Sequence, residues 1–405
     1  MTTSLERKQT TSRSTRASKP ANAAATGAIL DVVEWLSSDD CHELDDAGLI
    51  AGLGHRLRAA GLPIDRLTLH LRTLHPEILG RTVAWSPNEP VEIHDREHGI
   101  EVSADFIGSP LRQAMDSGEP LAVRLGATSA PRWTNIDVFR DRGLVEMLFI
   151  PLRSGDGLVS CASFCTMRPS GFASQERAAL DRIIPALRNA CELRTLRKVE
   201  LTLLDTYIGP TTAQRILAGR IRRGQVESLE AALLLCDLRG FTDLSNRLPS
   251  ERVLALLDAY FDRVVPAIAD GGGEVLKYMG DAVLAFFHRD DPAAACAAAL
   301  RSAESALERL AGFRAPDAAL HAGVALHYGA VSYGNIGSAR RLDFTVIGPD
   351  VNMVSRIQTI CGSVGRPLLM SGRFAALLGD RKTASIGRHA LKGFAEPAEL
   401  YAPAS

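Results

Sequence analysis

The chain has 405 residues, and its 46 Lys and Arg residues nearly balance 47 Asp and Glu residues, for a formal net charge of −1. At about 150 residues per domain, this length predicts two or three domains. The balanced charge excludes a general attraction to nucleic acid or to anionic membranes. We expect no membrane span, because no apolar run approaches the roughly 20 residues that one needs.

The seven cysteines indicate a reducing compartment. Their number is odd and they form no CxxC pair, so we expect no disulfide scaffold and a cytoplasmic location. Cys161 and Cys165 are four residues apart and would share one face of a strand. We interpret them as buried thiols, which are common in cores, with a metal or haem site as the alternative.

Residues 1–27 are predicted to form a disordered tail. The segment is rich in Ser, Thr, Arg and Lys and has few apolar residues to bury. It lacks the apolar core of a secretory signal, and its composition leaves a transit peptide as the alternative.

Residues 28–192 predict an α+β domain. "AILDVVEWL" and "AGLIAGLGHRLRAAG" have helical spacing, "RLTLHLRTL" alternates like a strand, and the turn "RSGDG" joins "MLFIPL" to "GLVSCASFC" as a hairpin. A long helix begins at Ser174. The stretches "FIPLRSGDGLVSCASF" and "GFASQERAALDRIIPAL" resemble a GAF-type sensory domain, which implies an unidentified small-molecule or ion effector. The scattered histidines lack the spacing of a haem site.

Residues 193–228 are predicted to be a helical linker. Apolar residues recur almost as in a coiled coil, so we expect the 180–204 helix to contact a second copy of the chain. Seven basic residues against two acidic ones lie between 194 and 223. We interpret this excess as a solvated face and predict no nucleic-acid partner, because there is no DNA-binding motif.

Residues 229–405 predict a ferredoxin-like α+β domain. Its expected elements follow the order strand, helix, hairpin, helix, strand and further strands. They are a buried strand at 231–236, a helix with Ser250 as N-cap, a hairpin turning at Gly280 and Asp281, a helix from Asp291 and Pro292, the strands "LHAGVALHYG" and "LDFTVIG", and a helix from about Asp350.

Two carboxylates stand at turns of this domain. Asp237 ends the buried strand, and Asp281 lies in the hairpin turn. If the two strands are neighbours, the acids meet at one sheet edge and repel each other unless a cation is held there. Oxygen ligands favour Mg²⁺ or Mn²⁺ with nucleotide phosphate completing the coordination shell. A turn aspartate that caps its own backbone is the alternative for each acid alone.

Polar side chains downstream suit a nucleotide. After Asp237, backbone N–H groups around Gly240, Phe241 and Thr242 are placed to cradle phosphate oxygens. Asn352 and Arg356 are four residues apart on one helix face, where the guanidinium is able to stabilise charge on phosphorus. A solvated helix face is the alternative for this pair.

A further polar set suits a nucleobase. Asp343 and Thr345 share one face of a strand and offer polar atoms to a base edge. Lys277 lies four residues before Asp281 and adds a donor close to them.

The four motifs "CDLRGFTDLS", "GGGEVLKYMGDAVLAFF", "GNIGSARRLDFTVIGPDVNMVSRI" and "LKGFAEPAELY" together resemble the catalytic domain of class III nucleotidyl cyclases. The resemblance implies that Asp237 and Asp281 bind two metal ions, assisted by the Leu238 carbonyl. It implies that Lys277 and Thr345 select adenine, that Asn352 orients ribose, that Arg356 stabilises the transition state and that Lys392 contacts triphosphate.

The resemblance further implies a reaction. ATP would be converted to cyclic AMP and pyrophosphate by in-line attack of the ribose 3′-hydroxyl on the α-phosphorus. Threonine at position 345 is the pattern of the subgroup that includes bicarbonate-responsive cyclases. In this family the active sites form between two domains, and the chain has one copy of each set, so a homodimer is expected.

Two alternatives to an adenylate cyclase stay open. Guanylate cyclases usually carry Glu and Cys where this chain has Lys277 and Thr345, which argues against GTP as the substrate. A non-catalytic module that binds nucleotide or a partner is the second alternative. Such modules normally lose a metal acid or the arginine, whereas both are present here.

Overall fold

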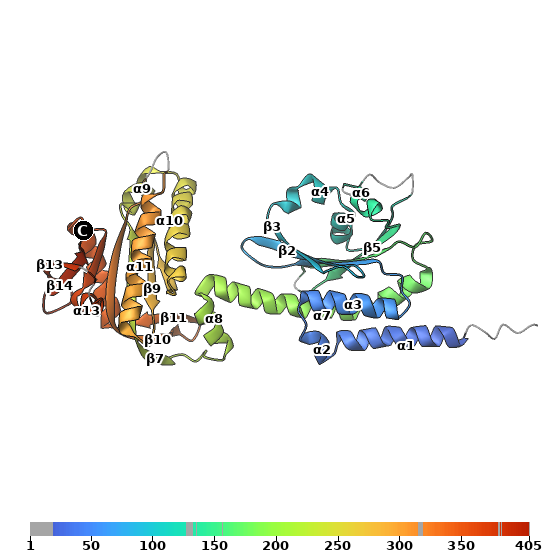
Figure 1. Cartoon of the computed structure of the whole chain (residues 1–405), viewed down its shortest axis with the longest axis horizontal. Coiled ribbons are helices and arrows are strands. Elements are labelled where there is room, and N and C mark those ends of the chain that lie inside the picture. The colour runs from blue at the N-terminus through green and yellow to red at the C-terminus, as the bar shows by residue number, and fades with distance from the viewer. Residues whose placement is uncertain are drawn as a thin grey trace, which may run out of the picture. The chain divides into compact units, whose positions relative to one another are not determined.

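The computed structural model describes residues 19–126, 133–134, 136–155, 157–314, 319–379, 381 and 383–404. The chain divides into two compact units, Met1–Leu203 and Leu204–Ser405, which are described separately below (Figure 1). Both units combine helices with a mainly antiparallel sheet, so the predicted α+β class is confirmed.

The N-terminal unit is built on an antiparallel sheet with strand order β3-β2-β1-β6-β5-β4. The strands are β1 Arg66–Arg72, β2 Ile78–Trp85, β3 Glu92–Glu97, β4 Leu121–Arg124, β5 Glu146–Arg153 and β6 Val159–Thr166. The helices are α1 Lys19–Leu36, α2 Asp39–His42, α3 Asp46–Ala59, α4 Ala104–Ile107, α5 Pro110–Ser117, α6 Ile136–Asp141 and α7 Ser174–Ile208, with a 3₁₀ turn at Ile100–Val102. The predicted β5–β6 hairpin is confirmed.

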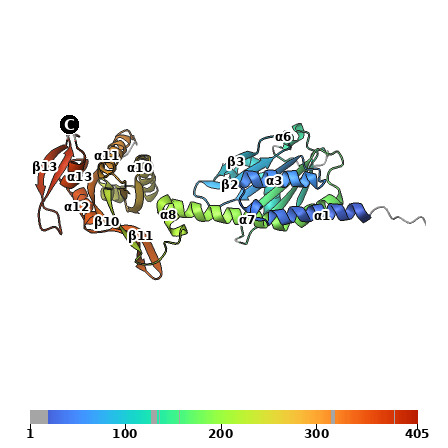
Figure 2. The same cartoon turned by 60° about the horizontal axis from the view of Figure 1, so that its bottom comes forward.

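Helices cover both faces of this sheet. Helices α1, α3 and the first half of α7 bury one face, and α5 and α6 pack on the other (Figure 1); Figure 2 shows α1, α3 and α7 from a second direction. Cys161 and Cys165 point into the second core and are free thiols, as all seven cysteines are. Burial raises the pKa of both to about 12, so they are inert thiols.

Two predictions for the N-terminal unit need correction. Helix α1 begins at Lys19, so residues 19–27 are helical instead of disordered, and the rest of the predicted tail lies outside the described residues. On α7, five positions of the expected dimer seam or beside it are buried in the unit's own core: Leu180, Ile183, Leu187, Ala190 and Cys191. The large apolar side chains that α7 exposes, Leu196, Leu201 and Tyr207, lie in its later part.

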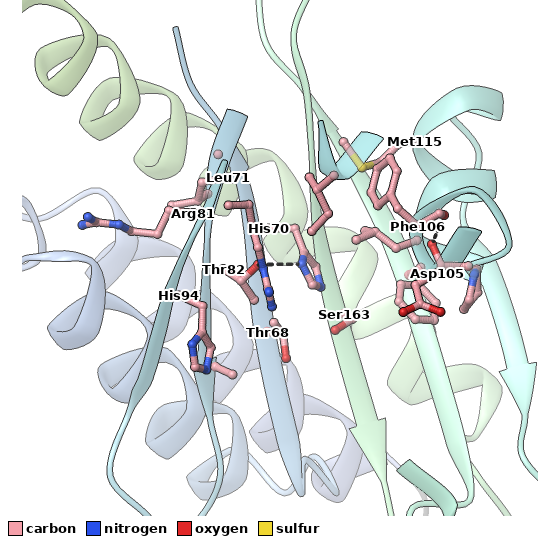
Figure 3. A pocket seen from close by; sticks show the side chains of 18 of the residues that line it. Thr68, His70, Leu71, Arg81, Thr82, His94, Asp105, Phe106, Met115 and Ser163 are labelled. Atoms are coloured by element: carbon pink, nitrogen blue, oxygen red, sulfur yellow. Dashed lines mark hydrogen bonds between the residues drawn. The ribbon is translucent and has the colours of Figure 1, made fainter. Parts of the chain in front are cut away.

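The N-terminal unit also encloses a cavity of about 460 Å³ (Figure 3). Its lining includes side chains of the sheet and of the segment that contains α4 and α5. A core that is packed at protein density does not leave a space of this size.

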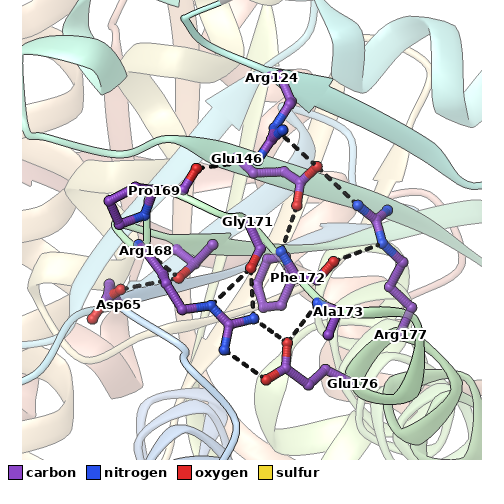
Figure 4. A network of polar contacts seen from close by, with 11 residues as sticks. Asp65, Arg124, Glu146, Arg168, Pro169, Gly171, Phe172, Ala173, Glu176 and Arg177 are labelled. Carbon is purple, nitrogen blue, oxygen red and sulfur yellow. Dashed lines mark hydrogen bonds and ion pairs between the residues drawn. The ribbon is translucent and has the colours of Figure 1, made fainter.

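A buried carboxylate fixes the start of α7 (Figure 4). Glu146 on β5 accepts hydrogen bonds from the Phe172 N–H at 2.7 Å and from Arg177 at 2.8 Å. Gly171 has φ +71°, and a Cβ there would lie 2.4 Å from the Glu146 carboxylate. Beside it, Arg168 pairs with Glu176 in the first turn of α7. The charge-assisted contacts therefore hold the helix to the sheet.

The C-terminal unit contains the predicted ferredoxin-like core. Strand β7, helix α10, strands β8 and β9, helix α11 and strand β10 follow one another, and the sheet order runs β10-β7-β9-β8. The elements of this part are β7 Val226–Leu238, α9 Phe241–Arg247, α10 Ser250–Asp270, β8 Glu274–Met279, β9 Ala282–Phe287, α11 Pro292–Ala311 and β10 Ala322–Ser338.

Further elements extend this core. They are α8 Pro210–Leu217, β11 Arg341–Ile347, α12 Pro349–Ser363, β12 Leu368–Ser371, α13 Gly372–Leu377, β13 Thr383–His389 and β14 Ala398–Pro403. Strands β12, β14 and β13 continue the sheet beyond β10, and β11 pairs with β10. Because β7 starts at Val226, the predicted linker ends three residues earlier than residue 228.

The unbroken apolar run of β7 is explained by burial on both faces. Ala232, Leu234 and Cys236 face the core beneath α10 and α11, whereas Leu233 and Leu235 face the core beneath α12. By the same alternation, Asp237 falls on the α12 face.

One helix boundary differs from prediction. Helix α10 has Pro249 at the N-cap position, and Ser250 is the first helical residue without a side-chain cap bond. The predicted start of α11 at Asp291 and Pro292 is confirmed, and the Asp291 carboxylate caps the helix by accepting from the N–H groups of Ala293 and Ala294. In the part of the chain that the structure describes, no helix is long and apolar enough to cross a bilayer.

We predict that Glu146→Gln destabilises the N-terminal unit. The substitution keeps the shape of the side chain but removes the charge that Arg177 and the Phe172 N–H contact, at a cost of about 1.5–3 kcal/mol. Urea unfolding of the full chain measures the effect. Glu119→Gln, at an exposed position, is the matched control, and equal stability of the two variants would contradict the assigned role of Glu146.

Candidate functional site

Strand pairing brings the two predicted acids together. Strands β7 and β9 are antiparallel neighbours with Asp237 opposite Ala282, and Asp281 directly precedes Ala282. The hairpin turn between Met279 and Ala282 contains only Gly280 and Asp281, and Gly280 adopts φ +69°, as a tight hairpin turn requires. The side chains of Asp237 and Asp281 are consequently in direct contact.

The contact is electrostatically unfavourable when both acids are ionised. Burial and the facing Asp281 carboxylate raise the pKa of Asp237 to about 6. Two acids held together in this way form a donor set of hard oxygen atoms, which Mg²⁺ and Mn²⁺ prefer. Among the described residues, no cluster of three or more His, Cys, Asp or Glu side chains suits a metal. Other oxygen ligands would have to complete the shell.

Gln358 is a site residue that sequence reasoning missed. Its amide Nε2 donates a hydrogen bond of 2.9 Å to Asp237 Oδ2. Gln358 lies on α12, two residues after Arg356, and α12 covers the sheet face to which Asp237 belongs. The signal in the sequence is too weak to have found it, because only the packing of α12 on β7 brings the amide to the acid.

The turn after Asp237 is formed as expected. Leu238 ends β7 with its side chain buried in the core, so only its backbone carbonyl is available to a ligand. Gly240 has φ +72°, and α9 begins at Phe241. Phe241 packs partly against the core, whereas the side chain of Thr242 is exposed.

The candidate nucleobase residues lie on β8 and on β11, two strands that are not paired but come close to each other. Lys277 Nζ lies 2.6 Å from Asp343 Oδ2, so the acid holds the lysine in place. Thr345, two residues along β11, is 6% exposed, and its hydroxyl is buried without a hydrogen-bond partner. A buried polar atom without a partner is costly, and a ligand atom would satisfy it.

Helix α12 carries Asn352 and Arg356. Asn352 is exposed, whereas Arg356 is half-buried and its Nε has no partner. The first turn of the helix is anchored by Asp350, which accepts from His327 at 3.0 Å and from the Ala330 N–H at 2.7 Å. This anchor, which sequence reasoning also missed, fixes the helix that presents both predicted side chains.

Lys392 does not join either set. It follows the buried Leu391 and is exposed, and it makes no hydrogen bond or ion pair with the residues that the structure describes. Its contact with triphosphate stays a prediction.

The remaining residues form two separate sets within one chain. No hydrogen bond or ion pair between described residues links Asp237 or Asp281 to Lys277, Thr345 or Arg356. Asp237 has Gln358 as its partner, and Lys277 pairs with Asp343, whereas the Thr345 hydroxyl has no partner among the described residues.

Comparisons with known proteins show to which family the C-terminal unit is similar in sequence. Residues 225–401 match the family model "Adenylate and Guanylate cyclase catalytic domain". An adenylate cyclase of Anabaena cylindrica is 29% identical over 184 residues, which are 44% of this chain and 36% of that protein. An uncharacterised protein of Mycobacterium tuberculosis is 30% identical over 239 residues, 57% of this chain and 41% of that protein.

Among solved structures, the adenylyl cyclase CyaB of P. aeruginosa is 26% identical, with 44% of this chain and 94% of that chain covered and a TM-score of 0.39. The chain spans only about two fifths of the length of the curated relatives named above. The family match begins at the residue before β7 and ends within β14, so it covers the whole sheet that carries the two acids. Residues 225–401 are therefore similar to the adenylate and guanylate cyclase catalytic domain.

Proposed function

We propose that this chain is an adenylate cyclase that converts ATP to 3′,5′-cyclic AMP and pyrophosphate. The observation that carries the proposal is the contact between Asp237 and Asp281 at the edge of the sheet. This pair is unstable as two free carboxylates and fits two Mg²⁺ or Mn²⁺ ions shared with a triphosphate.

When bound, the two metal ions would lower the pKa of the attacking ribose hydroxyl and neutralise charge on the phosphate oxygens. The protein supplies the position of the metals. Asp237 at the end of β7 and Asp281 in the turn between β8 and β9 would hold them, the Leu238 carbonyl would add one oxygen, and Gln358 keeps the Asp237 carboxylate in one orientation.

The other set would hold the nucleotide. Lys277 and the unpartnered hydroxyl of Thr345 would recognise the adenine edge, with Asp343 orienting the lysine. Asn352 would orient the ribose, and the guanidinium of Arg356 would stabilise charge that develops on the phosphorus. Backbone N–H groups at Phe241 and Thr242 would contact the phosphate oxygens, and Lys392 the triphosphate.

We place the complete site between two copies of the chain. Among the described residues, no hydrogen bond or ion pair joins the acids directly to Lys277, Thr345 or Arg356 within one chain; the hydrogen bond from α12 to Asp237 comes from Gln358. A C2 dimer would join the acids of one copy to Lys277, Thr345, Asn352 and Arg356 of the other, twice. The exposed apolar residues of α7 beyond Cys191 would add to the contact.

The N-terminal unit would regulate this site. A six-stranded sheet with helices on both faces supports its interpretation as a GAF-like sensory domain. Helix α7 starts in that unit and continues to Ile208, so it provides a continuous connection to the catalytic unit.

We predict that Asp237→Asn abolishes cyclic AMP formation. Loss of one charged metal ligand should lower turnover on the order of 100-fold or more. The melting temperature of the metal-free protein should be unchanged or higher, because the repulsion from Asp281 disappears. Cyclic nucleotide is measured with ATP and either Mg²⁺ or Mn²⁺. Asp258→Asn, an exposed acid on α10, is the control, and retained activity of Asp237→Asn would refute the assigned role.

A second prediction concerns the base. In wild-type protein, ATP should be the better substrate, and the double substitution Lys277→Glu with Thr345→Cys should shift the preference toward GTP by about tenfold or more. The ratio of kcat/KM values for the two nucleotides measures the shift. Preference of the wild type for GTP would identify a guanylate cyclase instead, and no product from either nucleotide would favour a binding module.

A third prediction tests the dimer. Asp237→Asn and Arg356→Ala should each be inactive alone, but an equimolar mixture of exchanged subunits should regain about a quarter of wild-type activity, because half of the dimers then contain one intact site of two. Cyclic AMP formation after subunit exchange gives the result. An inactive mixture whose mass shows mixed dimers would place the whole site in one chain.

A further inference from the structure

The cavity of the N-terminal unit has a polar end and an apolar end. Its volume of about 460 Å³ is in the range of small-molecule sites. Figure 3 shows His70, Thr82 and His94 on the neighbouring strands β1, β2 and β3, with Met115 and Phe106 across the space from them. A ligand that fills the cavity would therefore meet different chemistry at its two ends.

The polar end offers hydrogen-bonding groups both at its buried floor and at its solvent-exposed edge. Thr68 and Ser163 are 6% and 2% exposed, and their hydroxyls line the floor. His70 Nδ1 lies 3.4 Å from the Thr82 hydroxyl. His94 and Arg96 lie on the exposed edge strand β3, so the polar end reaches solvent there.

Positive charge exceeds negative charge around the cavity. Four arginines line it, at positions 66, 72, 81 and 96, against the two carboxylates of Glu92 and Asp105. Arg81 is neutralised by Asp95 at 2.6 Å and by Asp46 at 3.6 Å, both outside the lining.

Two of these arginines have capacity left for a ligand. Arg66 pairs with Glu92 at 2.9 Å, yet its side chain is only 11% exposed and its Nε is buried without a partner. Arg96 contacts only the Thr82 hydroxyl, at 3.4 Å, and forms no ion pair with a described acid. Both therefore face the polar end with unused donors.

The excess positive charge affects the pKa of His70, which lies at the floor of the cavity. Burial, together with the charges of Arg96 and Arg66, lowers the pKa of His70 to about 4. His70 is therefore neutral at physiological pH and adds a hydrogen bond without adding charge. A cationic ligand would meet the repulsion from Arg96 and Arg66 that adds to the effect of burial on His70.

The opposite end is apolar. Phe106, Leu111 and Met115 come from the α4–α5 segment, and Met147 and Phe149 from β5. Aromatic rings and a methionine together form a surface that adapts to a flat or branched apolar group.

We propose that this cavity binds a small organic anion, with its acidic group against Arg96, Arg66 and His70 and its apolar body against Phe106 and Met115. Carboxylates and phosphate esters share the chemistry that the arginines recognise. The inference goes beyond the cyclase reaction, and its test measures binding alone.

Isothermal titration calorimetry of the full chain tests the proposal with four matched probes. Naphthoate and naphthyl phosphate carry an anion on an aromatic body, naphthylmethanol has the body without charge, and acetate has the charge without the body. We expect at least one of the two aromatic anions to bind about tenfold or more tightly than naphthylmethanol and acetate. The tighter of the two identifies the acidic group as carboxylate or phosphate.

Variants then locate the bound probe. Arg96→Ala, at an exposed position on β3, should weaken binding of the aromatic anion by about tenfold, and Met115→Trp should weaken the binding of every naphthyl probe by filling the apolar end. Arg182→Ala, an exposed arginine on α7, should leave the affinities unchanged. Circular dichroism shows whether each variant is folded.

Three results would overturn the proposal. Naphthylmethanol could bind as tightly as the aromatic anions, none of the four probes could bind, or folded Arg96→Ala could bind the anions like the wild type. The first would indicate an apolar site, the second a space that takes no such ligand, and the third an anion bound elsewhere on the protein.

Discussion

The contact between Asp237 and Asp281 is the constraint around which the C-terminal unit is arranged. Two carboxylates are brought together at the edge of a sheet, where burial and mutual repulsion raise the pKa of Asp237. Nothing in the fold requires this cost, because an asparagine or serine would complete either turn. An arrangement that opposes folding and remains in the structure favours a ligand that compensates for it, and under the proposed function a divalent cation with nucleotide phosphate would do so.

The rest of the unit keeps this pair in place. Strand β7 is buried on both faces, so its position between β10 and β9 is fixed by two cores and by two ladders of backbone hydrogen bonds. Helix α12 contributes in two ways. Asp350 attaches its first turn to β10, and Gln358, two turns later, holds Asp237 from the same helix that presents Arg356. Movement of α12 would therefore affect both halves of the proposed reaction.

The N-terminal unit uses charge differently. Glu146 is enclosed by Arg177, Arg124 and the backbone of Phe172, so its negative charge is matched, and it ties α7 to the sheet. Around the cavity, the arginines are only partly paired with acidic or hydrogen-bonding partners. Their unpaired donors face a cavity whose opposite wall is apolar. The first arrangement serves stability, and the second is suited to recognition.

The sequence by itself determined the order of elements in the C-terminal unit, the hairpin at Gly280 and Asp281, and the two candidate acids. Each follows from a local signal: the spacing of apolar residues predicts strands and helices, a glycine marks the tight turn, and an acid directly after an apolar run marks the end of a buried strand. It placed the start of α1 too late. It also assigned the apolar positions in the first half of α7 to a dimer contact, because a helix that packs on its own sheet and one that pairs with another helix have the same apolar spacing. Only the tertiary structure decided that Gln358 holds Asp237, that Asp350 anchors α12 and that a cavity lies over the N-terminal sheet. Each of these depends on contacts between residues far apart in the chain, and local sequence patterns do not predict such contacts.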